Sequence, residues 1–218
     1  MSQLIFKFPF SKKYYEQDFF VSSNNFSAFK LIEEWPIWPG NWLNIFGDSG
    51  SGKTHLAKIL EKKIDKIKLI DAKNINNQLI QDLNNFECLI IDSFNNNIDE
   101  KIFYSILNQS KQLENYVLIN SMTSIKNINF KLTDLQSRIN SFVNIGIELP
   151  TDDLLKVIIS KTLSDKQISI NPKISEYIIK NVERSYEKMF KFLKDLDDLS
   201  LSTGKSININ LIKKVLDQ

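Results

Sequence analysis

Short apolar runs alternate with longer amphipathic segments over the first 150 residues of the chain. Runs of strand length predict β-strands at 42–46, 67–70, 88–91, 116–119 and 142–149, the last ending before Pro150. Helical periodicity between them predicts helices over 53–64, 75–83, 99–113 and 132–140. Strands that alternate with helices predict a parallel five-stranded sheet covered by helices on both faces.

After Pro150 the pattern changes. Thr151 can cap a helix, and Asp152 and Asp153 place carboxylates in its first turn. Only helical periodicity follows, over 152–164, 172–182, 185–201 and 208–216. We therefore expect an α/β base over residues 11–150 and a small all-helical lid over 151–218, with residues 1–10 as a separate N-terminal peptide.

The segment between the first predicted strand and its helix fits the phosphate-loop pattern GxxxxGK[ST]. Its residues are Gly47, Asp48, Ser49, Gly50, Ser51, Gly52, Lys53 and Thr54. The glycines let backbone N–H groups turn toward phosphates, Lys53 reaches the β- and γ-phosphates, and Thr54 offers a hydroxyl to Mg²⁺. A solvated glycine-rich turn is the alternative, but the flanking strand and helix favour binding of ADP or ATP.

Two later strands place polar groups where such a loop needs them. The run 89–91 ends at Asp92 and resembles the Walker B arrangement of AAA+ proteins, in which an aspartate serves Mg²⁺. Active AAA+ ATPases usually carry a second acid at the next position, and Ser93 is a poor base. Weak intrinsic hydrolysis is therefore expected. Asn120 follows the fourth strand and is a candidate sensor of the γ-phosphate; an ordinary strand-end residue is the alternative for both side chains.

Composition narrows the class of protein without fixing a function. A hydrophobic fraction of 42% and a charged fraction of 25% are typical of a globular protein, and a net charge of +2 neither indicates nor excludes nucleic acid. A single cysteine, Cys88, excludes a disulfide framework and a Cys/His zinc cluster. No secretory signal or membrane-length apolar run is present, so the expected location is cytoplasmic, without a membrane partner.

Several stretches together resemble the DnaA-related AAA+ family over nearly the whole chain. Residues 18–28 are similar to its "F-V-x-x-x-N-x-x-A" segment, 47–57 to its phosphate loop with Thr-His-Leu, 99–108 to its helix after Walker B, and 135–138 to its "L-x-S-R" segment. The resemblance implies that Phe20 and Val21 pack on the adenine and that Arg138 is an arginine finger acting in a neighbour's site. A plain surface arginine, or a salt bridge from Arg138 to Asp134, is the alternative. His55 adjoins the nucleotide; the sequence identifies no Ser, Cys or Asp that would make it a general base, and a surface or packed histidine is the favoured interpretation.

Two features resemble the short regulatory branch of that family, the Hda-type inactivators of DnaA. The chain stops after the lid at Gln218, without a helix-turn-helix domain, so no sequence-specific DNA binding is expected. Its start, with Gln3, Leu4, Phe6 and Phe8, resembles the peptide that such proteins insert into the replicative sliding clamp. The alternating apolar residues also fit a strand added to a sheet. The resemblance implies DnaA and the clamp as partners, with a homodimer and the choice of ADP or ATP left open.

The lid departs from the family pattern. A glutamate, Glu187, occupies the position of the lid's sensor arginine, and Arg184, expected on the same helix face, is the substitute candidate or only a helix cap. A regulator that stimulates ATP hydrolysis by DnaA is the function that the resemblance implies. An autonomous AAA+ loader of the helicase or transposition type is disfavoured by Ser93, and a small-molecule kinase by the absence of an arginine-rich lid inserted within the sheet.

Overall fold

The computed structural model describes residues 15–217, which divide into two compact units, 15–148 and 149–217. The predicted clamp-binding peptide lies outside the described part of the chain, with its residues Gln3, Leu4, Phe6 and Phe8.

The first unit is built on a five-stranded sheet whose neighbouring strands are all parallel. The strands are β1 (Trp42–Phe46), β2 (Ile67–Asp71), β3 (Cys88–Phe94), β4 (Tyr116–Ser121) and β5 (Val143–Gly146). Their order across the sheet is β2-β3-β4-β1-β5. The expected parallel five-stranded sheet is therefore confirmed.

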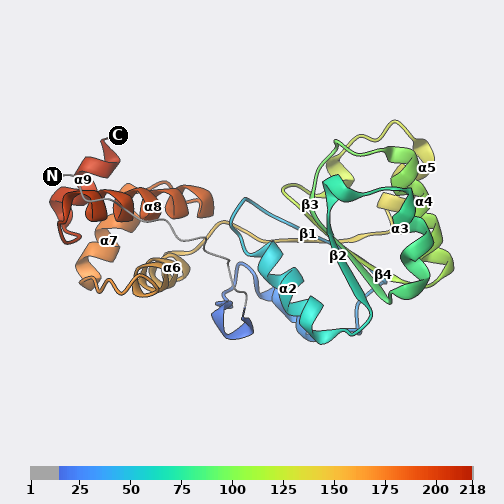
Figure 1. The fold of residues 1–218 in the computed structure, drawn as a ribbon, viewed down its shortest axis with the longest axis horizontal. Coiled ribbons are helices and arrows are strands. Elements are labelled where there is room, and N and C mark those ends of the chain that lie inside the picture. Colours follow the sequence, from blue (N-terminus) through green and yellow to red (C-terminus); the bar gives the residue numbers. More distant parts are fainter. Residues whose placement is uncertain (1–14, 218) are drawn as a thin grey trace. The chain divides into compact units, whose positions relative to one another are not determined.

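Helices cover both faces of this sheet (Figure 1). They are α1 (Phe26–Glu33), α2 (Lys53–Lys63), α3 (Asn77–Asp82), α4 (Glu100–Gln112) and α5 (Thr133–Ile139), with short 3-10 turns at η1 (Glu16–Asp18), η2 (Ala72–Asn74), η3 (Leu83–Asn85) and η4 (Ile125–Asn127). Successive strand residues point to opposite faces, so Ile90 packs toward α1 and α2, while Leu89 and Ile91 pack toward α3, α4 and α5. Two separate apolar cores result, one on each face.

Cys88 begins β3 and is fully buried in the core on the α1–α2 face. Burial in these apolar surroundings raises the pKa of its thiol far above the ordinary value. The only cysteine of the chain is therefore a packing residue that stays protonated.

Several element boundaries differ from the sequence-based expectations. Strand β3 continues past residue 91 to Phe94, and β5 is shorter than the predicted run 142–149. The helix predicted over 75–83 starts only at Asn77, because the side chain of Asn76 accepts a hydrogen bond from the Leu79 N–H and caps it there. Helix α1 was not predicted at all.

The second unit contains helices and no strand among its described residues. Its helices are α6 (Asp152–Ser164), α7 (Pro172–Asn181), α8 (Tyr186–Thr203) and α9 (Ile209–Leu216). All four are capped by side chains that accept backbone N–H groups, those of Thr151, Asn171, Ser185 and Asn208, and Gly204 ends α8 in the left-handed conformation. The unit has an apolar core of its own around Ile159, Met189 and Leu193.

Candidate functional site

The glycine-rich loop leaves the carboxyl end of β1 and leads into α2 at Lys53. Gly52 precedes the helix with φ of 99°, a left-handed conformation that favours glycine. A Cβ added there would lie 2.8 Å from Cε2 of Phe19, which is closer than unbonded carbon atoms can approach. This loop shape therefore depends on glycine at position 52.

The Lys53 side chain folds back over the loop. Its ammonium donates hydrogen bonds to the backbone oxygens of Gly47 (2.7 Å) and Asp48 (2.8 Å). Burial lowers the pKa of Lys53, and the carboxylates of Asp92 and Asp48 act in the opposite direction. The Lys53 ammonium therefore lies over the loop, bonded to two of the loop's own backbone oxygens.

Thr54, Asp92 and Asn120 meet at the carboxyl edge of the sheet. The Thr54 hydroxyl donates to Oδ2 of Asp92 at 2.8 Å. The Asn120 amide donates to Oδ1 of Asp92 and to the backbone oxygen of Lys53, both at 3.0 Å. A carboxylate beside a hydroxyl is an oxygen donor set that suits Mg²⁺, which binds proteins through few side chains and otherwise through water and phosphates.

Ser93 sits at an irregularity in β3. The register of β3 against β4 shifts between Ile91 and Phe94, and Ser93 adopts φ of 57°, which is uncommon for a residue with a side chain. The strand was expected to end near Asp92, and this boundary is wrong, since pairing resumes at Phe94. The bulge leaves Ser93 exposed beside buried Asp92. Ser93 occupies the position where active AAA+ ATPases usually carry a second acid.

An aromatic contact underlies the loop. The Phe19 ring stacks on Phe29 at a centroid distance of 5.6 Å and meets the edge of His55 at 5.4 Å. His55 Nε2–H donates to the backbone oxygen of Tyr15 at 2.7 Å. His55 therefore joins α2 to the segment just before η1. The sequence singled out Phe20 instead, whose side chain is 44% exposed, and periodicity alone could not separate two adjacent phenylalanines. Adenine packing by Phe20 and half-buried Val21 stays a prediction.

Arg138 lies in the last turn of α5, and its Nε–H donates to Oδ1 of Asn108 on α4 at 2.7 Å. The alternative salt bridge to Asp134 is not formed, and no other described residue bonds to the guanidinium. Arg138 lines a hollow of about 420 Å³ together with Asn108, Lys111 and Gln112, none of which is acidic. Sequence reasoning found Arg138 but not Asn108.

Strand register places Arg138 and the phosphate loop at opposite ends of the sheet. Strands β1 and β5 are parallel, with Leu43 opposite Val143 and Phe46 opposite Gly146. The loop follows the carboxyl end of β1, whereas Arg138 precedes the amino end of β5. Arg138 is therefore not part of the chain's own phosphate-loop site.

Arg184 does not lie on the helix face expected for it. It precedes Ser185, the N-cap of α8, whereas Glu187 lies in the first turn. Its guanidinium pairs instead with the carboxylate of Asp152 at the start of α6. The shared face with Glu187 is thus a wrong expectation, because the helix begins after Arg184, and a role of Arg184 in nucleotide binding stays a prediction.

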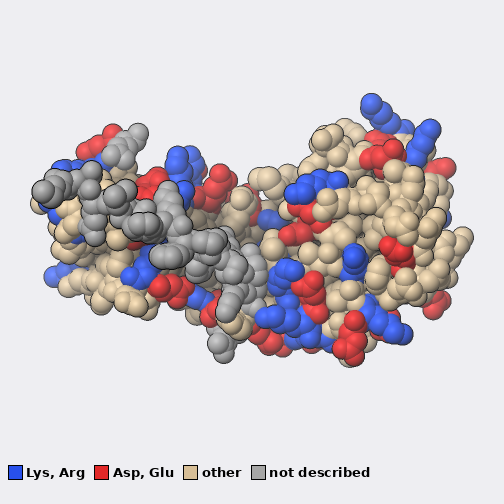
Figure 2. All heavy atoms as spheres, viewed as in Figure 1, with Lys and Arg blue, Asp and Glu red and all other residues tan. Residues whose placement is uncertain are grey.

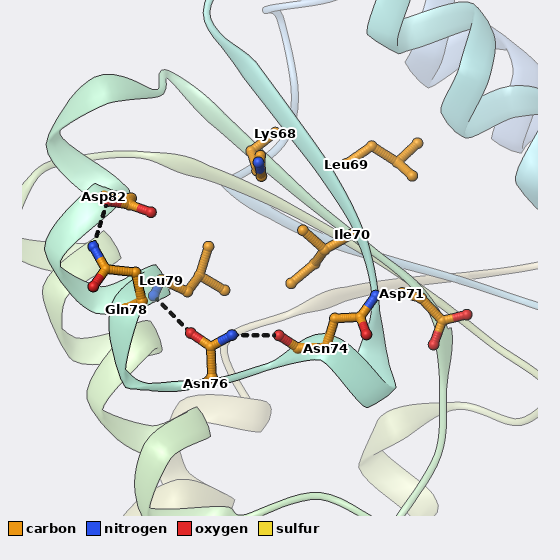
Figure 3. Close-up of a pocket in the computed structure, with 9 residues that line it drawn as sticks. All are labelled: Lys68, Leu69, Ile70, Asp71, Asn74, Asn76, Gln78, Leu79 and Asp82. Carbon is orange, nitrogen blue, oxygen red and sulfur yellow. Dashed lines mark hydrogen bonds between the residues drawn. The ribbon is translucent and has the colours of Figure 1, made fainter.

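A second hollow of about 420 Å³ opens at the edge strand β2 (Figure 3). Several of its polar side chains form hydrogen bonds with neighbouring residues of the chain. Asn76 donates to the backbone oxygen of Asn74 and accepts from Leu79, and Gln78 donates to Asp82. These bonds shape the start of α3, and we assign no ligand to this hollow.

Charges are interspersed on the one face that Figure 2 draws. On the face drawn in Figure 2, basic and acidic side chains alternate among the described residues in both units. Among residues 15–217 no helix is both long and apolar enough to cross a membrane.

Comparisons with known proteins agree with this architecture. Residues 152–216 match the family model described as "Hda, lid domain". The chain is 26% identical over 248 residues to the chromosomal replication initiator protein DnaA of Buchnera aphidicola subsp. Baizongia pistaciae, a match that covers 100% of this chain and 53% of that relative. The DnaA of subsp. Cinara cedri is 25% identical, again with 53% of its length covered. The chain thus spans about half the length of these relatives.

Solved structures show the same fold. Domain III of the replication initiation protein DnaA from Thermotoga maritima superposes with a TM-score of 0.79 at 19% identity, over 96% of this chain and 98% of that one. AMPPCP-bound DnaA from Aquifex aeolicus gives 0.70 at 18% identity, over 89% of this chain and 68% of that one.

The parallel sheet with its glycine-rich loop, followed by a helical unit, defines a P-loop protein of the AAA+ class. Within that class, the lid match and the similarity along the chain both point to Hda and DnaA. The chain is similar to the Hda lid over residues 152–216 and to DnaA along its length, which supports an Hda/DnaA-related AAA+ protein.

Proposed function

We propose that this chain binds ADP or ATP with Mg²⁺ and regulates replication initiation by stimulating ATP hydrolysis in a DnaA partner. Its loop offers backbone N–H groups and Lys53 to the phosphates, while Asp92 and Thr54 supply oxygen atoms for the metal. Magnesium bound there would neutralise phosphate charge.

The observation that carries the proposal is the location of Arg138. An arginine finger stabilises the charge that develops on the transferred phosphoryl group, and it is often supplied by another chain. Arg138 lies at the end of the sheet away from its own loop, and its terminal nitrogens bond to no described residue. This arrangement supports action in a partner's site rather than in its own.

The nucleotide of the chain itself has a structural role in this proposal. Ser93 occupies the position of the second acid, and a hydroxyl does not activate water as a carboxylate does. Slow turnover favours a long-lived bound nucleotide, with ADP as the expected resident. Arg184 is a further candidate contact if it leaves Asp152.

The partner assignment rests on the family. DnaA is the AAA+ chain whose ATP site Arg138 would complete, and residues 3–8 would tether the protein to the sliding clamp through Gln3, Leu4, Phe6 and Phe8. An extended peptide of this kind offers alternate side chains to pockets on its receptor. The proposed setting is the cytoplasm.

Substitution of Arg138 tests the proposal. Arg138→Ala should reduce the stimulated rate of ATP hydrolysis by DnaA on DNA-loaded clamp by on the order of 10³-fold if the finger supplies its full effect. Arg138→Lys should rescue little, because lysine lacks the planar fork that binds two phosphate oxygens. Nucleotide affinity and thermal midpoint of the chain itself should not change.

Lys131→Ala is the matched control, since it removes an exposed positive charge just before α5 and should leave stimulation intact. Full stimulation by Arg138→Ala would refute the trans mechanism. Brisk ATP turnover by the chain alone would instead favour the autonomous loader.

A further inference from the structure

The further inference concerns Asn108 and rests on the proposed function of Arg138. Asn108 lies on α4, half-buried, and its Oδ1 accepts the Nε–H of Arg138 at 2.7 Å. A guanidinium has five N–H donors in a fixed plane. A bond at Nε leaves both terminal nitrogens available and restricts the rotation of the side chain.

The chemistry of the acceptor matters. An amide oxygen orients the guanidinium without cancelling its charge, whereas a carboxylate at the same place would form an ion pair and weaken its attraction for phosphate. None of the described residues that line the hollow is a carboxylate, and Lys111 adds a second positive charge. Arg184 shows the contrasting arrangement, because its charge is paired with Asp152.

The choice of arginine is also informative in this chain. Only two of its 28 basic side chains are arginine, Arg138 and Arg184. Lysine carries the same charge elsewhere, so charge alone does not account for arginine at position 138. Arginine differs in its planar fork, and a fork is useful only when its orientation is fixed.

We propose that Asn108 is a positioning residue that presents the Arg138 fork to the phosphates of a nucleotide bound by the partner chain. Asn108 itself touches no nucleotide. The bond to Asn108 restricts the Arg138 side chain before the reaction begins. Less rotamer freedom is then lost in the transition state, when the two terminal nitrogens must both meet phosphoryl oxygens.

A comparison of two amides tests this inference. Asn108→Ala should lower the stimulated kcat of DnaA on DNA-loaded clamp about 10-fold, since small misplacements of a catalytic group cost one to two orders of magnitude. The concentration of this chain that gives half-maximal stimulation should stay within about 2-fold. Gln112→Ala is the matched control: Gln112 lines the same hollow one turn along α4 but does not bond to Arg138, and both parameters should stay unchanged.

A carboxylate variant separates orientation from charge. Asn108→Asp keeps an acceptor at the same place but neutralises the guanidinium, so it should lose at least as much kcat as Asn108→Ala. An Asn108→Ala protein that stimulates DnaA with the wild-type kcat overturns the inference. So does a Gln112→Ala protein with an equal loss of kcat, or an Asn108→Ala protein in which only the concentration for half-maximal stimulation changes. If Arg138→Ala also stimulates fully, the proposed function itself has failed; if only Asn108→Ala does, the failure is confined to Asn108.

Discussion

The hydroxyl of Thr54 donates to Oδ2 of Asp92 at 2.8 Å, joining the first turn of α2 to β3. The two residues are 38 positions apart in sequence, yet both belong to the predicted magnesium site. Asn120 holds the other oxygen of the same carboxylate. The orientation of Asp92 is therefore set by protein hydrogen bonds, so little reorganisation is needed when a metal and a phosphate bind.

Lys53→Ala should remove most of the affinity for ADP and ATP. The substitution deletes the positive charge that the loop holds over the oxygens of Gly47 and Asp48. Titration calorimetry with each nucleotide measures the effect. Lys58→Ala, on the same helix and in an ion pair with Glu61, should bind as the unmodified chain does. Equal affinities for all three proteins would contradict the phosphate-loop assignment.

Gly52→Ala should destabilise the chain by at least about 1 kcal/mol and impair nucleotide binding, because φ of 99° disfavours a side chain and the new methyl group would collide with Phe19. Chemical denaturation measures the stability. Gly40→Ala is the control, since a Cβ there meets Val143 Cγ2 at an ordinary 3.9 Å. A stable, nucleotide-binding Gly52→Ala protein would show that the loop does not depend on this contact.

Ser93→Asp should raise the intrinsic rate of ATP hydrolysis from a low starting level. Aspartate tolerates the left-handed conformation at this position and supplies the missing carboxylate beside Asp92. Ser93→Asn has a similar shape and backbone preference but no charge, and should remain slow. Steady-state phosphate release measures all three proteins. Fast ATP hydrolysis by the unmodified chain would mean that another residue orients the attacking water.

Replacement of Gln3, Leu4 and Phe6 by alanine should abolish binding to the sliding clamp and leave nucleotide affinity intact. The apolar side chains would supply the buried area, while Gln3 would fix the register by hydrogen bonds. A pull-down with purified clamp tests this, with loss of residues 1–8 as the second comparison. A triple variant that unfolds would favour the alternative of a strand added to a sheet.

Most of the fold follows from the sequence, because buried parallel strands are short apolar runs and their helices have one apolar face. Strand β1 and helix α6 match their predicted ranges. The end of β3 does not, since the register of β3 against β4 shifts around Ser93, next to Asp92, which bonds to Thr54 and Asn120 of other elements. Periodicity contains no such information.

The candidate site divides in the same way. The loop around Lys53 is local in sequence, so a motif identifies it. The contact of Phe19 with Gly52 and the bond between Asn108 and Arg138 each join distant segments, and no spacing rule predicts them. Arg184 was misplaced on a helix because Ser185, its near neighbour, is the residue that caps α8.

The buried thiol of Cys88 has a practical consequence. Thiolate is the form that reacts with maleimides and disulfides, and a protonated thiol inside the sheet offers neither the reactive form nor access. The natural chain is thus already suited to site-specific labelling. A cysteine introduced at Ile37, which is 79% exposed, would carry a single fluorophore and leave the native packing of β3 intact.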